Sequence, residues 1–151
     1  MLISYCLRTN YADERKFIET LASINRQTGD KEIIVCGIAP NSVNYTYIPM
    51  AEEANTGKTS IMRDRGFEYA TGSFIVAMDD DIILADDFQE HIGEEHLQIP
   101  QCIQFPYGGR FWDWCVIDHP KLGQRKVPYD MPYTKYHYLS GQCSLGSYQP
   151  V

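Results

Sequence analysis

The sequence predicts an α/β fold in which a mainly parallel central sheet is flanked by helices. Two observations predict it: apolar runs typical of buried strands alternate with segments of helical periodicity, and polar loops follow the strands. The chain has 151 residues, of which 44% are hydrophobic, which suits one globular domain with a sizeable core. We therefore expect a single domain over residues 1–151, with ligands bound beyond the carboxyl ends of the strands.

A strand, a helix and a second strand open the predicted pattern. Residues 2–7 form an apolar run typical of a buried strand. The helix that follows carries its apolar residues at helical spacing, at Phe17, Leu21 and Ile24. Asp13 or Asn10 is expected to cap this helix, and Gly29 to end it. Residues 32–36 are rich in β-branched side chains and predict the second strand.

Four further elements are expected before residue 100. Residues 45–48 predict a short strand, and a polar stretch over residues 52–58 leads into a second helix over about residues 59–70. The strongest buried-strand candidate is residues 73–78. A third helix is expected over about residues 86–99, with its apolar face formed by Phe88, Ile92 and Ile99.

The last third of the chain has a different texture, with short strand-like pieces, turns and many aromatic residues. The aromatic residues there are Tyr107, Phe111, Trp112, Trp114, Tyr129, Tyr133, Tyr136 and Tyr138. Their flat apolar faces are of the kind on which a sugar ring can stack, and the alternative is that they complete a small core. Because no linker or internal repeat separates this part, we expect it to belong to the same domain.

Charge and cysteine content narrow the functional classes. The 13 Lys and Arg residues against 20 Asp and Glu residues give a net charge of -7, which argues against binding to nucleic acid or to an anionic membrane. The apolar runs are far shorter than the roughly 20 residues that span a bilayer, so we expect a soluble chain without an integral membrane segment. The five cysteines are an odd number and widely spread, which fits a reducing cytoplasm better than a disulfide framework.

Three consecutive aspartates follow the strongest strand candidate. Left unpaired at a buried strand end, Asp79, Asp80 and Asp81 would repel one another and be poorly solvated. Carboxylate oxygens suit hard divalent ions, and Mg²⁺ or Mn²⁺ is usually held by one or two carboxylates together with phosphate oxygens. The alternative is a solvated acidic turn that caps the next helix. The apolar strand in front of the aspartates favours a site.

Several motifs in the first 90 residues resemble family 2 glycosyltransferases of the GT-A fold. The matching motifs are Arg8-Thr9-Asn10-Tyr11, Ser23-Ile24-Asn25-Arg26-Gln27-Thr28, Asn55-Thr56-Gly57, Arg63-Asp64-Arg65-Gly66, Ala70-Thr71-Gly72-Ser73-Phe74-Ile75 and Met78-Asp79-Asp80-Asp81, the last at the D-x-D motif of the family. Each motif alone is weak, and the ordered set is fairly specific. A weaker continuation at Tyr138-Leu139-Ser140-Gly141-Gln142-Cys143 is similar to the acceptor-side glycine segment.

The resemblance implies an inverting transferase with a Rossmann-like GT-A domain, a nucleotide-sugar donor, a carbohydrate acceptor and Mn²⁺ or Mg²⁺. It assigns the metal to Asp81 with Asp79 in support, the ribose contact to Asp80 or Asp79, and the nucleobase contact to Thr9. Arg63 would lie near the nucleotide and offset the charge of its diphosphate. Residues 1–100 would then form the nucleotide-sugar-binding half, and residues 101–151 the acceptor-side half.

Two departures from the family pattern limit the assignment. Where the family usually has an aspartate after its second strand, this sequence has Cys36-Gly37-Ile38-Ala39, so the nucleobase is left open. The family's general base lies downstream of the glycine segment, and only ten residues follow Gly141, so we expect a truncated acceptor side. The acidic and histidine candidates in that half are Asp118, Asp130 and His137, and nothing in their spacing singles one out. The catalytic base is therefore unassigned.

Two alternatives to a glycosyltransferase remain. A nucleotide-sugar-binding domain without turnover would explain the unassigned base. An aspartate-nucleophile phosphatase also places a D-x-D motif after a strand, but that motif normally opens such chains, whereas two strand–helix units precede it here.

Overall fold

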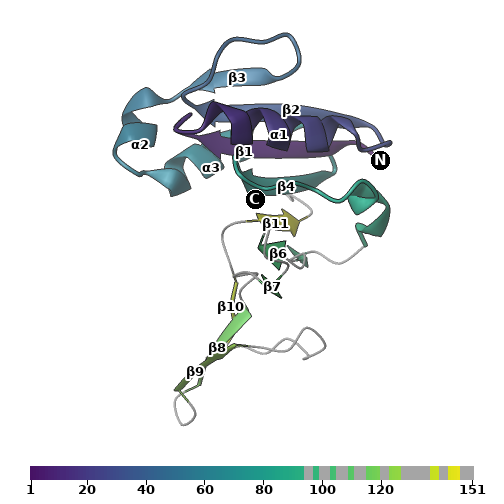
Figure 1. Ribbon diagram of the computed structural model, residues 1–151, viewed down its shortest axis with the longest axis vertical. Helices are drawn as coiled ribbons and strands as arrows, with labels where there is room; N and C mark the ends of the chain where they lie inside the picture. Colours follow the sequence, from purple (N-terminus) through teal and green to yellow (C-terminus); the bar gives the residue numbers. More distant parts are fainter. Residues whose placement is uncertain are drawn as a thin grey trace.

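The computed structural model describes residues 1–93 in full and, beyond them, the backbone of short strands. One sheet has the strand order β3-β2-β1-β4-β11-β5, and its order from β3 to β11 can be followed in Figure 1. Its members are β1 (Ile3–Thr9), β2 (Lys31–Gly37), β3 (Thr46–Pro49), β4 (Phe74–Asp79), β5 (Leu97–Gln98) and β11 (Cys143–Gly146). Strands β3, β2, β1 and β4 are parallel to one another, and β11 pairs antiparallel with both β4 and β5. The predicted α/β fold with a mainly parallel sheet is confirmed.

The remaining strands form two smaller antiparallel sheets. They are β6 (Ile103–Gln104) with β7 (Gly109–Arg110), and β8 (Cys115–His119) between β9 (Gly123–Lys126) and β10 (His137–Leu139). The aromatic side chains expected to meet a sugar lie outside the residues whose side chains the structure describes.

Helices α1 (Glu14–Asn25) and α3 (Thr59–Tyr69) cover opposite faces of the sheet. Side chains of β1 alternate between the two faces. Those on the α1 side pack with Phe17 and Ile24 into one buried cluster, and they are Ile3, Tyr5 and Leu7. On the α3 side Cys6 packs with Met62 of the helix and with Ile34 and Cys36 of β2. Both cysteines are free thiols, and none of the helices in residues 1–93 is long and apolar enough to cross a membrane.

The predicted cap of α1 is correct, and the predicted end is not. Asp13 is the N-cap, and its carboxylate accepts a hydrogen bond of 3.1 Å from the amide of Lys16. The helix ends at Asn25, four residues before Gly29, because the chain must turn there to enter β2 at Lys31.

Two helical segments differ from the expectation. The polar stretch after β3 contains a short helix, α2 (Ala51–Asn55), whose alanines and glutamates are good helix formers and whose acidic residues lie in its first turn. The expected third helix is a single 3-10 turn, η1 (Phe88–His91), which precedes Gly93 and strand β5. Phe88 and Ile92 still pack against the core, so the periodicity located the buried side chains but not the backbone conformation.

The amino-terminal ends of the central strands are held by one partly buried cluster around Glu32. Its carboxylate accepts hydrogen bonds from the hydroxyl of Ser4, from the amide and hydroxyl of Thr71 at 2.6 and 3.0 Å, and from the amide of Gly72 at 3.1 Å. Burial raises the pKa of the Glu32 carboxyl, but these hydrogen bonds outweigh it and hold the pKa below its ordinary value. The Thr71-Gly72 pair of the family motif therefore ties the end of α3 to the sheet.

Replacing Glu32 with glutamine should lower the free energy of unfolding by about 2 kcal/mol at pH 7, because hydrogen bonds to a charged group are lost. A depressed pKa in the folded state stabilises the protein above the unfolded pKa, and that contribution disappears as the pH falls through the folded value. The difference between wild type and Glu32→Gln should therefore shrink below about pH 4.5. Urea unfolding at several pH values measures this, with the exposed Glu90→Gln as control. A difference that does not depend on pH would contradict the role of the carboxylate.

Candidate active site

The acidic motif lies at the carboxyl ends of two neighbouring parallel strands. β1 ends at Thr9 and β4 at Asp79, and Arg8 is the register partner of Asp79. Strand ends of an open parallel sheet are where α/β folds bind ligands. The structure thus brings the predicted residues Thr9, Asp79 and Asp80 into one place.

Thr9 supports the acidic motif directly. Its side chain is 3% exposed, and its hydroxyl donates a hydrogen bond to the Asp80 carboxylate. The same oxygen accepts a hydrogen bond of 2.8 Å from the amide of Tyr11, a residue in the left-handed region with φ 56°. The hydroxyl is therefore engaged within the protein, and the nucleobase contact that the resemblance assigns to Thr9 stays a prediction.

Asp79 is paired with a residue that the sequence did not single out. The guanidinium of Arg8 forms an ion pair with the Asp79 carboxylate, and both side chains are largely buried. A partly buried pair of this kind offsets the charge of one of the three aspartates. Arg8 was named only as part of the Arg8–Tyr11 motif, and its pairing with Asp79 could not be predicted because it depends on the β1–β4 register.

Asp81 is the exposed member of the three aspartates. Partial burial of its carboxyl group and repulsion from Asp79 and Asp80 raise the pKa of Asp81, and the charge of Lys16 opposes this shift. Negative charge is thus concentrated at a carboxylate that ligands can reach.

The chemistry of these donors fits a divalent cation that shares its ligands with a phosphate. Within residues 1–93 no three acidic, cysteine or histidine side chains converge to hold a metal ion by themselves. Mg²⁺ and similar ions commonly take one or two carboxylates and complete their coordination with phosphate oxygens and water. The residues present fit that mode better than a cage made only of protein ligands.

Arg63 lies on α3 beside the same strand ends. It lines a small pocket between the helix and the sheet together with Arg8, Cys6, Leu7, Met62, Gly66 and Met78. Burial, and then repulsion from Arg8, lower the pKa of Arg63, while Asp79 and Asp64 act in the opposite sense. Two arginines thus line one pocket, Arg8 paired with Asp79 and Arg63 beside it, and guanidinium groups of this kind are suited to bind an anionic ligand.

Gly37 ends β2, within the Cys36–Ala39 stretch that lacks the aspartate expected from the resemblance. Its φ is +125°, and a Cβ atom built there would lie 1.9 Å from the carbonyl oxygen of Thr9. That oxygen accepts a hydrogen bond of 3.0 Å from the amide of Ile38. A side chain at this position is excluded because β1 and β2 end in close contact.

The carboxyl-terminal strand reaches the site through its backbone. β11 begins at Cys143, which pairs with Met78, the residue before Asp79. The end of the predicted acceptor-side segment is therefore next to the strand that carries the acidic motif. The base candidates Asp118, Asp130 and His137 lie outside the residues whose side chains the structure describes.

The fold is similar to the crystal structure of TarS 1–349 from S. aureus, a glycosyltransferase. The TM-score is 0.50 and the sequence identity 20%, over 60% of this chain and 30% of that chain. At this identity the likeness shows the fold, which is glycosyltransferase-like, and this chain spans 30% of the length of that structure. No protein-family model matches the sequence, and no curated protein matches it.

Proposed function

We propose that the chain is a metal-dependent glycosyltransferase that moves a sugar from a UDP-sugar to a glycan-like acceptor with inversion. The observation that carries the proposal is the meeting of three aspartates with Arg8, Thr9 and Arg63 at the strand ends of a glycosyltransferase-like sheet. Charges of both signs within one site suit a nucleotide diphosphate bound together with a divalent cation.

The proposed roles follow from the surroundings of each side chain. Asp81 is exposed, and burial of its carboxyl group and repulsion from Asp79 and Asp80 raise its pKa. Because a cation would relieve that repulsion, Asp81 would hold Mn²⁺ or Mg²⁺ together with oxygens of the diphosphate. Asp80, anchored by Thr9, would contact the ribose. Asp79 would support the metal electrostatically, since its carboxylate already pairs with Arg8. Arg63 would lie along the diphosphate.

The proposed reaction is a single displacement. An acceptor hydroxyl would attack the anomeric carbon of the donor sugar, the bond from that carbon to the diphosphate would break, and the hydroxyl proton would pass to a base. A bound divalent cation supplies Lewis-acid stabilisation of the charge on the leaving diphosphate. The residues of this chain would bind and orient the nucleotide, with Asp81 holding the cation and the Arg63 guanidinium facing the developing charge.

Manganese should strengthen UDP binding, and UDP should strengthen manganese binding by the same factor. Without a cation, the aspartates would repel the diphosphate of UDP. Like charges about 4 Å apart repel by roughly 4 kcal/mol at an effective dielectric of 20, and the two arginines offset part of this repulsion. We therefore expect at least a tenfold gain in UDP affinity, about 1.4 kcal/mol, on saturation with manganese. Titration calorimetry at constant ionic strength measures both affinities.

An Arg63→Gln variant serves as the companion to this titration. Equal UDP affinity with and without manganese, combined with loss of binding in Arg63→Gln, would contradict the coupling and assign the diphosphate to the arginines. Incubation with UDP-sugars and manganese then separates the two functional classes. Sugar transfer or slow donor hydrolysis supports the enzyme, whereas tight binding without either supports a nucleotide-sugar-binding domain.

A further inference from the structure

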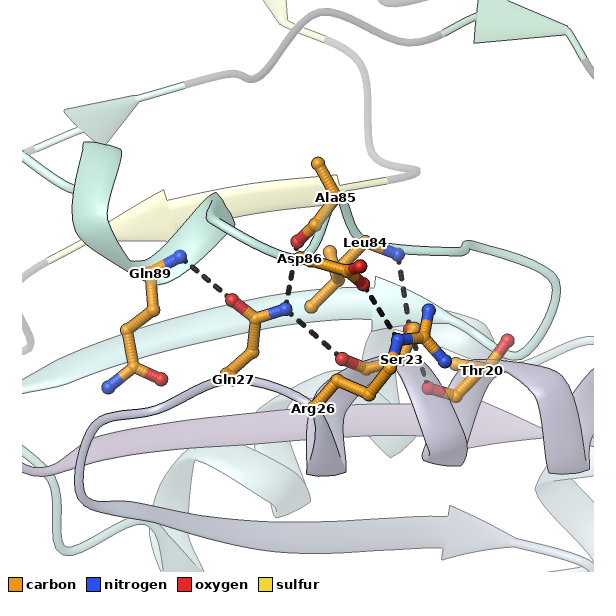
Figure 2. A network of polar contacts seen from close by, with 8 residues as sticks. All are labelled: Thr20, Ser23, Arg26, Gln27, Leu84, Ala85, Asp86 and Gln89. Atoms are coloured by element: carbon orange, nitrogen blue, oxygen red, sulfur yellow. Dashed lines mark hydrogen bonds and ion pairs between the residues drawn. The ribbon is translucent and has the colours of Figure 1, made fainter.

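The segment after the acidic motif has little regular structure of its own. Between the end of β4 and the turn η1 the chain forms neither helix nor strand, so its backbone amide and carbonyl groups need other partners. Helix α1 packs against this segment (Figure 2). One of these contacts reaches Asp80 of the acidic motif.

The face of α1 that meets this segment is polar and buried. Thr20 and Ser23 are 0% exposed and Gln27 is 2% exposed. A helix normally turns apolar residues toward the core, and buried polar groups cost free energy unless they are hydrogen-bonded. These three side chains therefore need partners. Thr20 and Ser23 lie three residues apart on one side of α1, and Gln27 follows two residues after the helix end; we call the three the polar row.

Each of the three side chains bonds the backbone of the segment. The hydroxyl of Thr20 donates to the carbonyl of Asp80 at 2.9 Å, and the amide of Leu84 donates to the hydroxyl of Ser23 at 3.1 Å. Gln27 donates to the carbonyl of Ala85 at 2.8 Å and accepts from the amide of Gln89 at 2.9 Å, as Figure 2 shows.

The three contacts differ in where they act. Ser23 and Gln27 hold the chain downstream of the acidic motif, from Leu84 to Gln89. Thr20 alone among them holds a residue within the motif. Asp80 is thereby fixed from two sides, since Thr20 binds its carbonyl and Thr9 binds its carboxylate.

We infer that Thr20 is a positioning residue for the acidic motif, acting through the Asp80 carbonyl to hold the neighbouring Asp81 carboxylate in the geometry that binds a metal–nucleotide pair. The inference rests on the proposed function for the identity of the ligand, but not for the constraint on the backbone. The other two members of the polar row, Ser23 and Gln27, hold the downstream part of the same segment, which supports the placement of the motif against the end of α1.

A pair of substitutions tests the role of the hydroxyl. Thr20→Val keeps the size and branching of the side chain and removes the hydrogen bond, whereas Thr20→Ser keeps the hydroxyl and removes a methyl group. We expect Thr20→Val to weaken UDP binding at saturating manganese about tenfold, as the loss of an outer-sphere partner does at metal sites. Thr20→Ser should bind UDP nearly as well as wild type, although both variants lose stability. Gln27→Leu removes the bonds of that side chain to Ala85, Gln89 and the carbonyl of Ser23 but none to the motif, and it is the control for destabilisation.

The second readout does not depend on the ligand. Amide hydrogen exchange should accelerate at Asp81 and Ile82 in Thr20→Val, and remain close to wild type there in Thr20→Ser. If wild-type protein binds no UDP with manganese, the proposed function fails and the exchange data decide the positioning role alone. Wild-type exchange at these amides in Thr20→Val would overturn the inference, as would UDP affinity in that variant equal to that of Gln27→Leu.

Discussion

Replacing Asp81 with alanine should abolish manganese-dependent UDP binding while the fold stays intact. Asp81 is the exposed carboxylate of the acidic motif, and repulsion from Asp79 and Asp80 makes it the place where a cation is most favourable. With the other two carboxylates held by Arg8 and Thr9, we expect the loss to exceed about 100-fold, roughly 2.8 kcal/mol of binding free energy. Titration calorimetry with saturating manganese measures the loss.

Asp87→Ala is the matched control for this variant. It removes one negative charge from the same stretch of chain, but Asp87 is an exposed residue that pairs with His91 at 3.1 Å and lies outside the motif. UDP affinity in Asp87→Ala should stay within about twofold of wild type, because exposed charges are well screened at physiological ionic strength. If Asp81→Ala binds UDP and manganese as tightly as Asp87→Ala does, the metal assignment is wrong.

Replacing Gly37 with alanine should give the largest loss of stability. The new Cβ atom would lie 1.9 Å from the carbonyl oxygen of Thr9, and 2.8 Å from the terminal methyl of Met62, at a φ of +125°. Overpacking and an unfavourable backbone conformation each cost about 1–3 kcal/mol, so we expect a loss of about 3–5 kcal/mol in the free energy of unfolding. Denaturant unfolding followed by circular dichroism provides the measurement.

A second glycine separates the two causes. Gly57 also has a positive φ, of +70°, but a Cβ atom there would meet nothing within 4 Å. Gly57→Ala should therefore cost only the backbone term, about 1–2 kcal/mol. Equal losses for the two variants would show that the contact between Gly37 and Thr9 relaxes without cost, contrary to the packing described for the ends of β1 and β2.

Local signals predicted most of the sheet and its first helix. Strands β1, β2 and β4 lie within one or two residues of their predicted bounds because each is an apolar run between turn residues. Asp13 was one of two predicted caps, with Asn10, because side-chain oxygens before an apolar helical pattern accept hydrogen bonds from the first free amides. The cluster of aspartates also needed no structure to be noticed, since three adjacent carboxylates after a buried strand demand compensation.

Features that depend on long-range pairing could not be predicted. The ion pair of Arg8 with Asp79 joins residues 71 positions apart, and it exists because β1 and β4 pair in one register. The role of the polar row at the end of α1 could not be predicted until the segment that it binds was known, although Ser23 and Gln27 lie in a motif that resembles the family pattern. The prediction of a third helix over residues 86–99 was wrong for the same reason, because the pairing of β5 with β11 competes with the local helical periodicity.

The position of β11 also affects how the chain behaves toward other copies of itself. β4 contains five consecutive buried apolar residues, Phe74, Ile75, Val76, Ala77 and Met78. An unpaired strand of this composition is a template for edge-to-edge association and aggregation. By pairing with β4 from Ile75 to Met78, four residues near the end of the chain satisfy that edge. On the opposite side β3 is four residues long and ends at Pro49, which has no amide to donate. Loss of β11 would therefore show itself first as insolubility.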